Sequence, residues 1–267
     1  MASIINNVAS QNASRNLAAS QKGLNSTINR LSTGYRINRA SDDAAGLQIS
    51  NNLRADVKIL NQARRNANDG LGRLAIADLV SEEATNLLTR AAELAEQAAS
   101  GTTTTAGRTA LDSEYTEIKE ALDALDSDTK FDGQDVFGQA LDIRVGENTS
   151  ESISIASVDI DSASLGVAGD LLDSANAGAA LATITAAISQ VSADRGAIGA
   201  KSQRLATVIN SLGITSENIT AAESQIRDAD VATEVVNLTK FQILSQSGVS
   251  ALAQANQSAQ SVLSLLG

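Results

Sequence analysis

The chain of 267 residues contains no cysteine, histidine, proline or tryptophan, and its aromatic content is only 2%. Without cysteine no disulfide can form, and without cysteine and histidine the side chains that dominate zinc sites are missing. Histidine is also the commonest general acid–base group near neutral pH. These absences weigh against an enzyme, and we expect no catalytic residues, no cofactor and no metal site.

The scarcity of aromatic residues and the lack of proline also bear on the fold. Large cores usually gain much of their buried area from aromatic side chains, whereas here alanine, leucine, isoleucine and valine supply the apolar content. This composition favours thin, elongated helical packing. Because proline breaks helices and isomerises slowly, its absence suits a chain that is exported unfolded and folds at its destination.

Charge and hydropathy exclude two classes of partner. The net charge of −11 at pH 7 disfavours nonspecific binding to nucleic acid, which needs a basic surface. No apolar run is long enough to span a bilayer, and residues 1–22 lack the apolar core of a cleaved secretory signal. We expect no nucleic-acid partner, no membrane insertion, and export without such a signal if the protein leaves the cell.

Apolar residues recur at helical spacing through most of the first 125 residues. They predict a first helix over about residues 7–33 and a second over about 44–100, which is a rod of roughly 80 Å at about 1.5 Å per residue. Gly101 and the threonines after it end this rod. A third helix, with apolar positions from Leu111 to Leu125, then returns antiparallel to the second.

The C-terminal half predicts two more helices. The cleanest heptad pattern covers about residues 177–212, and this helix is the natural third member of a bundle with the two before it. The last helix covers about 216–266. Its apolar stripe is interrupted by polar residues, so it is poorly stabilised alone.

The pattern changes between the third and fourth helices. Asp132-Gly133 is a turn dipeptide, and apolar residues then alternate in Leu141, Ile143 and Val145 and again, less regularly, before residue 160. This alternation predicts a short β-hairpin or small meander between about residues 136 and 160.

Two short motifs have both a structural and a functional interpretation. Gly34 can end the first helix, and Asp42-Asp43 can cap the second. The two acids could instead bind a metal or act in catalysis, but no further acidic residues lie at ligand spacing and no histidine supports them. The stretch 196–202 is weakly similar to a phosphate-binding loop but has Ala200 where that motif needs glycine, and both flanks are helical. Its glycines are interpreted instead as points where neighbouring helices approach closely.

The stretch from Arg30 to Gly70 is similar to a known family signature. It contains Arg-Leu-Ser-Thr-Gly, then Arg-Ile-Asn, Ser-Asp-Asp-Ala-Ala-Gly and, at residues 65–70, Arg-Asn-Ala-Asn-Asp-Gly. This string closely resembles the N-terminal signature of bacterial flagellins. The segments Ile226–Glu234 and 252–257 (Leu-Ala-Gln-Ala-Asn-Gln) resemble the C-terminal signature of the same family. The resemblance covers about residues 1–135 and 177–267 and leaves no room for large outer domains.

The resemblance and the helical pattern together imply a fold. We expect a mainly α protein of long, coiled-coil-like helices in an elongated bundle, with one small β-hairpin element and with both termini helical and paired. Residues 1–43 and 222–267 would form a terminal coiled-coil domain, and residues 44–221 a helical bundle that carries the hairpin.

The resemblance also implies a function. Flagellins pass unfolded through the flagellar type III export system and polymerise outside the bacterium into the flagellar filament that drives motility. The implied partners are further copies of the chain, the export machinery, a flagellin chaperone, and the filament cap and hook-junction proteins. The alternative is a hook–filament junction protein, which would share the terminal helices but occur in few copies.

Two sets of residues are candidates for contact. The first, which we call the terminal seam, holds the apolar positions of the terminal helices that we expect neighbouring copies to help bury: Leu17, Leu24, Ile28, Leu31, Val235, Leu238, Val249, Leu252, Leu263 and Leu266. The second resembles a flagellin segment that packs along the protofilament and in some members is bound by Toll-like receptor 5: Arg90, Glu93, Leu94, Gln97 and, by alignment, Glu117.

Overall fold

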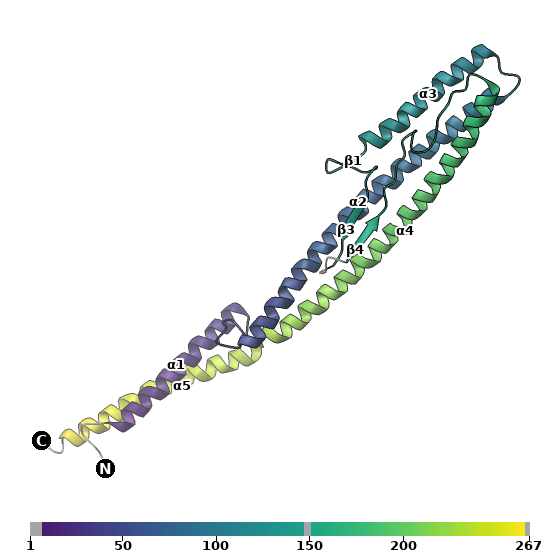
Figure 1. The fold of residues 1–267 in the computed structure, drawn as a ribbon. Helices are drawn as coiled ribbons and strands as arrows, with labels where there is room; N and C mark the ends of the chain where they lie inside the picture. The colour runs from purple at the N-terminus through teal and green to yellow at the C-terminus, as the bar shows by residue number, and fades with distance from the viewer. Residues whose placement is uncertain (1–6, 147–150, 265–267) are drawn as a thin grey trace. The chain divides into compact units, whose positions relative to one another are not determined.

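The computed structural model of the chain describes residues 7–146 and 151–264, with side chains in the last helix described to Ser258. It contains long helices and two small hairpins (Figure 1). The elements are α1 Val8–Thr33, α2 Ala44–Ala99, α3 Thr105–Asp128, β1 Lys130–Phe131, β2 Gln134–Asp135, β3 Leu141–Arg144, β4 Ser152–Ile155, α4 Ser174–Arg227 and α5 Val231–Ser264. The predicted mainly α fold with a small β element is confirmed.

The chain divides into two compact units. The terminal unit comprises residues 1–55 and 218–267, and the central unit comprises residues 56–217. The sequence-based boundaries, with a terminal domain at 1–43 and 222–267 and a helical bundle at 44–221, stay a prediction.

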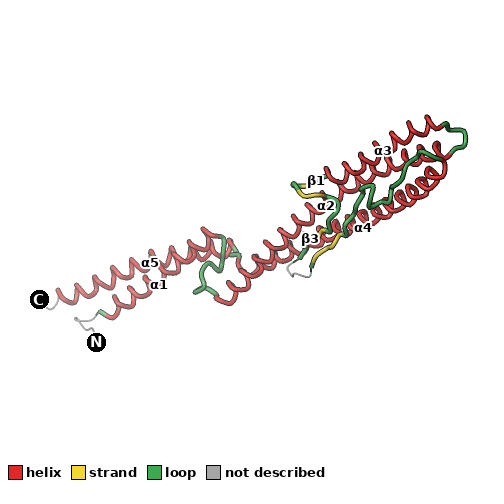
Figure 2. The backbone as a smooth tube through the Cα atoms, turned by 45° about the horizontal axis from the view of Figure 1, so that its top comes forward, coloured by secondary structure: helices red, strands yellow, loops and turns green. Residues whose placement is uncertain are grey.

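In the central unit, α2, α3 and α4 lie side by side (Figures 1 and 2). They share one core, whose largest fully buried side chains include Leu88, Leu94, Tyr115, Leu122, Ile184 and Val191. The heptad positions predicted for the fourth helix face this core, since Ile184, Ile198 and Leu205 are buried and Ile188 is half-buried. Small apolar residues on α2, such as Ala84 and Ala91, are also buried, which lets the helices pack closely.

The connection from β4 to α4 is also part of this core, although its sequence pattern gave little signal. Its apolar side chains Ile160, Leu165, Val167 and Leu171 are buried. Three aspartates of α3 accept hydrogen bonds from its backbone N–H groups. Asp126 accepts from Ile160 at 3.1 Å, Asp123 from Ser162 at 2.8 Å and Asp112 from Leu171 at 2.8 Å. The connection therefore runs antiparallel to α3. The carboxylates of α3 accept backbone hydrogen bonds that a neighbouring strand would accept in a sheet.

The two hairpins are antiparallel, with β1 paired to β2 and β3 paired to β4. The β3–β4 hairpin lies inside the predicted range, and residues 147–150 between its strands are outside the described residues. The β1–β2 hairpin was missed because two-residue strands are too short to show alternation. Its turn, however, is the predicted Asp132-Gly133, where both residues have positive φ (51° and 75°), as a type I′ turn requires.

One face of α2 receives both hairpins. Gly70 leaves no room for a side chain because Ile143 of β3 lies over it. One turn earlier, the Asn66 side-chain amide donates to the Arg144 carbonyl oxygen at 3.3 Å. One turn later, the buried Arg73 guanidinium donates to the carbonyl oxygens of Asp135 and Val136 at 2.7 and 3.2 Å. The Arg-Asn-Ala-Asn-Asp-Gly motif thus supplies part of a platform for the hairpins.

The ends of the last two helices differ from the prediction. The fourth helix does not stop at Leu212, and no helix begins near Ser216; instead α4 continues to Arg227 and α5 begins at Val231. The break lies at Asp228-Ala229-Asp230. Asp230 caps α5 by accepting the Ala232 N–H at 3.0 Å and the Thr233 hydroxyl at 2.7 Å, which explains why the helix restarts there.

In the terminal unit, α1 and α5 lie side by side and antiparallel in both views (Figures 1 and 2). The pairing of the two terminal helices is as predicted. The helices approach closely at two glycines: a Cβ on Gly23 would lie 2.5 Å from the Phe241 ring, and one on Gly248 would lie 3.2 Å from a Leu17 methyl group. Each helix therefore places one large side chain over a glycine of the other.

Candidate assembly surfaces

Two connections between helices meet in the terminal unit. Residues 34–37, after α1, run against residues 226–229, between α4 and α5. The Arg36 N–H donates to the Arg227 carbonyl oxygen at 2.7 Å, and the Ala229 N–H donates to the Gly34 carbonyl oxygen at 2.9 Å. The Arg227 guanidinium lies 4.3 Å from the centre of the Tyr35 ring, a cation–π contact. The two connections therefore hold each other in place.

Capping residues shape the first of these connections as predicted. Gly34 has φ 75° and its N–H donates to the Arg30 carbonyl oxygen at 2.8 Å, which ends α1. Asp43 accepts the Gly46 N–H at 2.9 Å and so caps α2. Asp42 accepts the N–H groups of Arg39 and Asn38, and these hydrogen bonds hold the pKa of Asp42 below its ordinary value. Asp43 thus caps α2 as predicted, whereas Asp42 holds the turn before the helix and does not cap it.

One charged pair ties α1 to α5. Arg30 lies 3.2 Å from Glu234, whose side chain is only 9% exposed. Nearer the chain ends, the Asn7 amide donates to the Ala255 carbonyl oxygen at 3.0 Å, and the Ser10 hydroxyl donates to Asn256 at 2.9 Å. Polar bonds therefore add to the apolar contact between these helices.

The residues of the terminal seam differ in burial: some lie between α1 and α5, and others are exposed on the surface. Five of its members are half-buried: Leu17, Leu24, Leu31, Leu238 and Leu252. Three are largely exposed, namely Ile28 at 46%, Val235 at 47% and Val249 at 53%. The remaining two, the Leu263 side chain and Leu266, lie outside the described part of the chain. The pair of helices in one chain covers only part of this seam.

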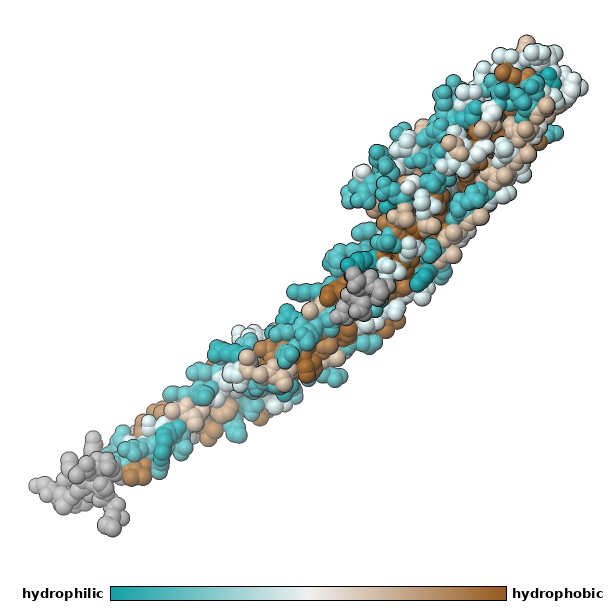
Figure 3. Space-filling model, in the orientation of Figure 1, coloured by the Kyte–Doolittle hydropathy of each residue, from teal (hydrophilic) through white to brown (hydrophobic). Residues whose placement is uncertain are grey.

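A second apolar face lies on α5. Val235, Val236, Ile243 and Leu244 line a shallow groove with Thr239 and Lys240, and the exposed fractions of Val236 and Ile243 are 67% and 60%. Figure 3 shows hydrophobic patches along the terminal helices, whereas the surface over α3 is mostly hydrophilic. Sequence reasoning missed Val236, Ile243 and Leu244 because it followed one heptad stripe and these residues lie beside it.

The segment from Arg90 to Gln97 lies on α2 in the central unit. Arg90, Glu93, Gln97 and, on α3, Glu117 are exposed. Arg90 contacts Glu114 of α3 at 2.8 Å and Glu93 at 3.0 Å, and hydrogen bonds to these two carboxylates raise the pKa of Arg90 above its ordinary value. Four of the five predicted residues are thus accessible.

The fifth residue of this segment, Leu94, requires a correction. Its exposed fraction is 1%, and it packs in the core between the helices. Leu94 cannot contact a partner unless the bundle opens. Its contribution to this surface is to fix the helix that carries Arg90.

The glycines of the 196–202 stretch also require a correction. Gly196 and Gly199 lie in the middle of α4 and are exposed, and a Cβ at either position would meet nothing within 4 Å. They are therefore not points of close helix approach within this chain. Because the stretch is helical throughout, it forms no phosphate-binding loop either.

The described residues contain neither a metal-binding cluster nor a membrane-spanning helix. In residues 7–146 and 151–264, no three acidic side chains gather in an arrangement that could hold a metal ion. Among the helices described, none is long and apolar enough to cross a membrane.

Family models match both ends of the chain. The model for the bacterial flagellin N-terminal helical region matches residues 4–141, and that for the bacterial flagellin C-terminal helical region matches residues 181–266. Both ranges include the signature segments identified in the sequence.

Similar proteins agree along nearly the whole chain. A flagellin of Halalkalibacterium halodurans is 37% identical over 98% of this chain and 99% of its own length. Flagellin FlaB1 of Treponema pallidum is 34% identical, and a flagellin of Bacillus subtilis 33% identical, each over the same shares.

Solved structures show the same fold. The crystal structure of Bacillus cereus flagellin, 27% identical, superimposes with a TM-score of 0.51 over 55% of this chain and 88% of its own. A putative flagellar hook-associated protein from Vibrio parahaemolyticus reaches 0.58 over 70% of this chain and all of its own, and at 12% identity this likeness shows the fold alone. The chain belongs to the bacterial flagellins, a family of structural proteins that form the flagellar filament and not of enzymes.

Proposed function

We propose that the chain leaves the cell unfolded through the flagellar type III export system and polymerises outside it, with folding of the terminal unit coupled to assembly. The observation that carries this proposal is the poor burial of that unit. Among its described residues, Ile37 is the one fully buried hydrophobic side chain, whereas Val231, Val236 and Ile243 are each more than half exposed. Copies of the chain can supply the missing burial.

The energetics support this coupling. Fully burying a valine, leucine or isoleucine side chain contributes about 1.5–3 kcal/mol, whereas fixing one residue's backbone costs about 1–2 kcal/mol. Two helices with half-buried contacts are therefore marginal alone. The exposed members of the terminal seam and the α5 groove are the surfaces that the polymer would cover.

The first experiment tests polymerisation. Purified monomer is mixed with short filament seeds and observed by electron microscopy, and we expect long helical filaments. Wild-type chain that never elongates seeds would overturn the proposal.

The second experiment tests coupled folding. Hydrogen exchange is measured on monomer and on polymer, and we expect the amides of α1 and α5 to exchange fast in the monomer and slowly in the polymer, while α2 and α4 within residues 56–217 stay protected in both. Strong protection of α1 and α5 in the free monomer would refute the coupling.

The partners of the family extend the proposal. A chaperone would cover the exposed apolar face of α5 before export, and the cap and hook-junction proteins would meet the chain at the two ends of the filament. Toll-like receptor 5 would read the surface of Arg90, Glu93, Gln97 and Glu117, all exposed. A junction protein would use similar terminal helices, so the copy number per flagellum, thousands or few, separates the two functions.

A further inference from the structure

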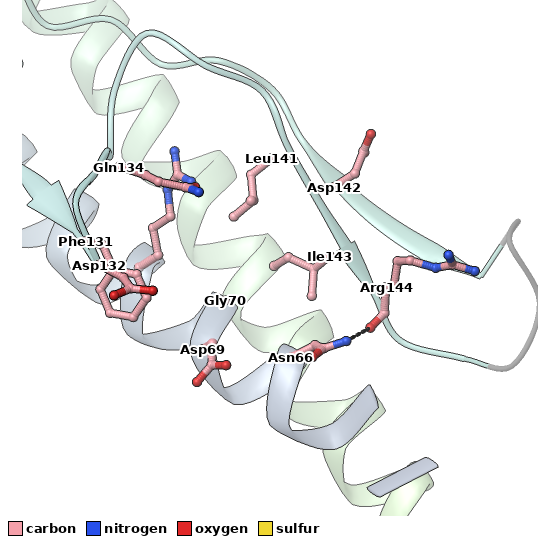
Figure 4. A pocket seen from close by; sticks show the side chains of 11 residues that line it. Asn66, Asp69, Gly70, Phe131, Asp132, Gln134, Leu141, Asp142, Ile143 and Arg144 are labelled. Carbon is pink, nitrogen blue, oxygen red and sulfur yellow. Dashed lines mark hydrogen bonds between the residues drawn. The ribbon is translucent and has the colours of Figure 1, made fainter. Parts of the chain in front are cut away.

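A cleft of about 720 Å³ lies in the central unit where the two hairpins meet α2 (Figure 4). Its walls include the apolar side chains of Phe131, Leu141 and Ile143. Two exposed carboxylates stand at its edge, Asp69 from α2 and Asp132 from the β1–β2 turn. The cleft therefore presents negative charge beside an apolar surface.

The basic residues of the cleft do not cancel this character. The buried Arg73 guanidinium donates to the carbonyl oxygens of Asp135 and Val136. The Arg144 side chain points away from the cleft in Figure 4. An apolar wall with carboxylates at its edge suits a cation carried on an aliphatic stem, which is the chemistry of lysine and arginine side chains.

The chain itself carries such cations in a separate region. Residues 1–65 hold nine Lys and Arg against three Asp and Glu, a net charge of +6. Residues 66–173 hold six against twenty-two, a net charge of −16. Residues 1–55 share a unit with residues 218–267, which hold two Lys and Arg against four Asp and Glu, so the basic region is clearest on α2, where residues 54–65 hold four against one. Opposite charges on different parts of each copy favour head-to-tail contact between copies over contact between identical surfaces.

Within the basic region, exposed cations are most concentrated on α2, whereas Lys22 and Arg39 are exposed singly. Arg54, Lys58 and Arg64 are exposed on this long helix. In contrast, Arg30 pairs with Glu234, and the Arg36 side chain donates to the Ile226 carbonyl oxygen at 2.7 Å.

We propose that the cleft receives a lysine or arginine side chain of α2, one of Arg54, Lys58 and Arg64, from a second copy of this chain. The inference rests on the proposed polymerisation and names one contact within it. The aliphatic stem lies against Leu141 and Ile143, and the charged head reaches Asp69 and Asp132. The contact aligns successive copies because the two charges lie on different parts of each chain.

The first test neutralises the cleft with Asp69→Asn and Asp132→Asn. Asparagine tolerates the positive φ of residue 132, so the turn is retained. The control is Glu83→Gln with Glu120→Gln, which changes the charge equally at exposed positions of α2 and α3 outside the cleft and outside the set of Arg90, Glu93, Gln97 and Glu117. The critical concentration for seeded polymerisation is measured at low and high salt. We expect the cleft variant to raise it roughly three- to tenfold at low salt, less at high salt, and the control to leave it unchanged.

The second test reverses the charges. One chain carries Asp69→Lys and Gln134→Lys at the cleft, and the other carries Arg54→Glu, Lys58→Glu and Arg64→Glu on α2. Each alone should elongate seeds poorly, and an equimolar mixture should elongate them well, because every contact in an alternating polymer joins opposite charges. Circular dichroism of each monomer checks that the bundle is folded.

Three outcomes would overturn the inference: a cleft variant that polymerises like its control, a loss that does not depend on salt, or a mixture that elongates no better than its components. Wild-type chain that forms no filament would refute the proposed function instead, so the two failures are distinguishable.

Discussion

The two units of the chain use similar helices but bury them very differently. In the described residues of the central unit, buried hydrophobic side chains extend from Ala63 to Leu212 along three helices and the connection that covers them. In those of the terminal unit the one such side chain is Ile37. In the central unit, three helices and the β4–α4 connection together bury the apolar faces of the helices. In the terminal unit, α1 and α5 leave their apolar faces half-covered. Most of the burial within one chain therefore lies in the central unit, and we expect the terminal unit to depend on neighbours.

The largest expected effect comes from removing part of the terminal unit. Deleting residues 250–267 takes away Ala255 and Asn256, which bond to Asn7 and Ser10 of α1. We expect polymerisation to be abolished, because the α1–α5 pair loses its outer half. The thermal unfolding of the central unit, followed by circular dichroism, should be unchanged. Filaments of the truncated chain, seen by electron microscopy, would show that assembly does not need the outer half of α5.

A pair of charge insertions separates the two units. Ile184 on α4 is fully buried, so Ile184→Asp should lower the free energy of unfolding by about 4 kcal/mol or more. Val236 on α5 is 67% exposed, so Val236→Asp should leave monomer unfolding nearly unchanged and impair assembly. Denaturant unfolding and seeded elongation give the two readouts. Similar effects of both variants on monomer stability would contradict the contrast between units.

At the half-buried Ile188, the same substitution should be milder. It lies one turn from Ile184 and packs only partly against the core. We expect Ile188→Asp to destabilise the bundle less than Ile184→Asp does. An unchanged melting temperature for Ile188→Asp would mean that the helix is rotated relative to the described packing.

Substitutions in the Arg90 segment distinguish surface from core. Leu94→Ala should cost about 2–5 kcal/mol of stability because it leaves a cavity between helices. Arg90→Ala should change stability little, since its ion pairs with Glu93 and Glu114 are exposed. If the polymer uses this surface, Arg90→Ala alone should shorten filaments. Normal filament length and motility in cells that express Arg90→Ala would refute a role for this surface in assembly.

The smallest effect concerns an acidic group in the central unit. Partial burial raises the pKa of Asp126 above its ordinary value of 3.8, and Asp161, Asp159 and Asp123 raise it further. The folded chain thus holds this proton more tightly than the unfolded chain. The stabilisation is complete below the ordinary pKa and is lost as the pH rises through the raised pKa.

Asparagine at this position keeps the oxygen that accepts the Ile160 N–H and removes the charge. We expect Asp126→Asn to stabilise the bundle modestly at pH 7 and to flatten the decline of stability with rising pH. Asp112→Asn is the control, because Asp112 makes the same kind of bond, to the Leu171 N–H, outside that acidic group. Denaturant unfolding at several pH values measures both, and equal changes would indicate that the acidic neighbours are unimportant.

The sequence predicted helix positions better than contacts. The ends of α1 and α2 matched within a residue or so, because Gly34, Asp43 and Gly101 mark them by local backbone chemistry. The break between α4 and α5 was displaced because Asp228-Ala229-Asp230 contains no proline or glycine to signal it. Asp230 caps α5 as Asp43 caps α2, but no glycine precedes it to mark the end of α4.

The candidate sites were predicted less completely than the fold. A heptad stripe identifies residues that some partner covers, but not whether that partner is the same chain. Leu24 and Ile28 belong to one stripe, yet Leu24 is half-buried and Ile28 is 46% exposed. The aspartates of α3 that bind the β4–α4 connection have no periodic signal, because their partners are backbone groups.

The bonded connections at residues 34–37 and 226–229 constrain the order in which the chain folds. Arg36 and Ile226 are 190 positions apart in sequence, and joining them in an unfolded chain closes a loop of that length. The entropy lost in closing a loop grows with its length, by about 0.6 kcal/mol for each doubling, and nothing in this short contact repays much of it. Once residues 56–217 have folded, most of that chain entropy has already been lost. We therefore expect the central unit to fold first and α1 and α5 to pair last. This order lengthens the time for which the two terminal helices remain unpaired and able to bind a growing filament.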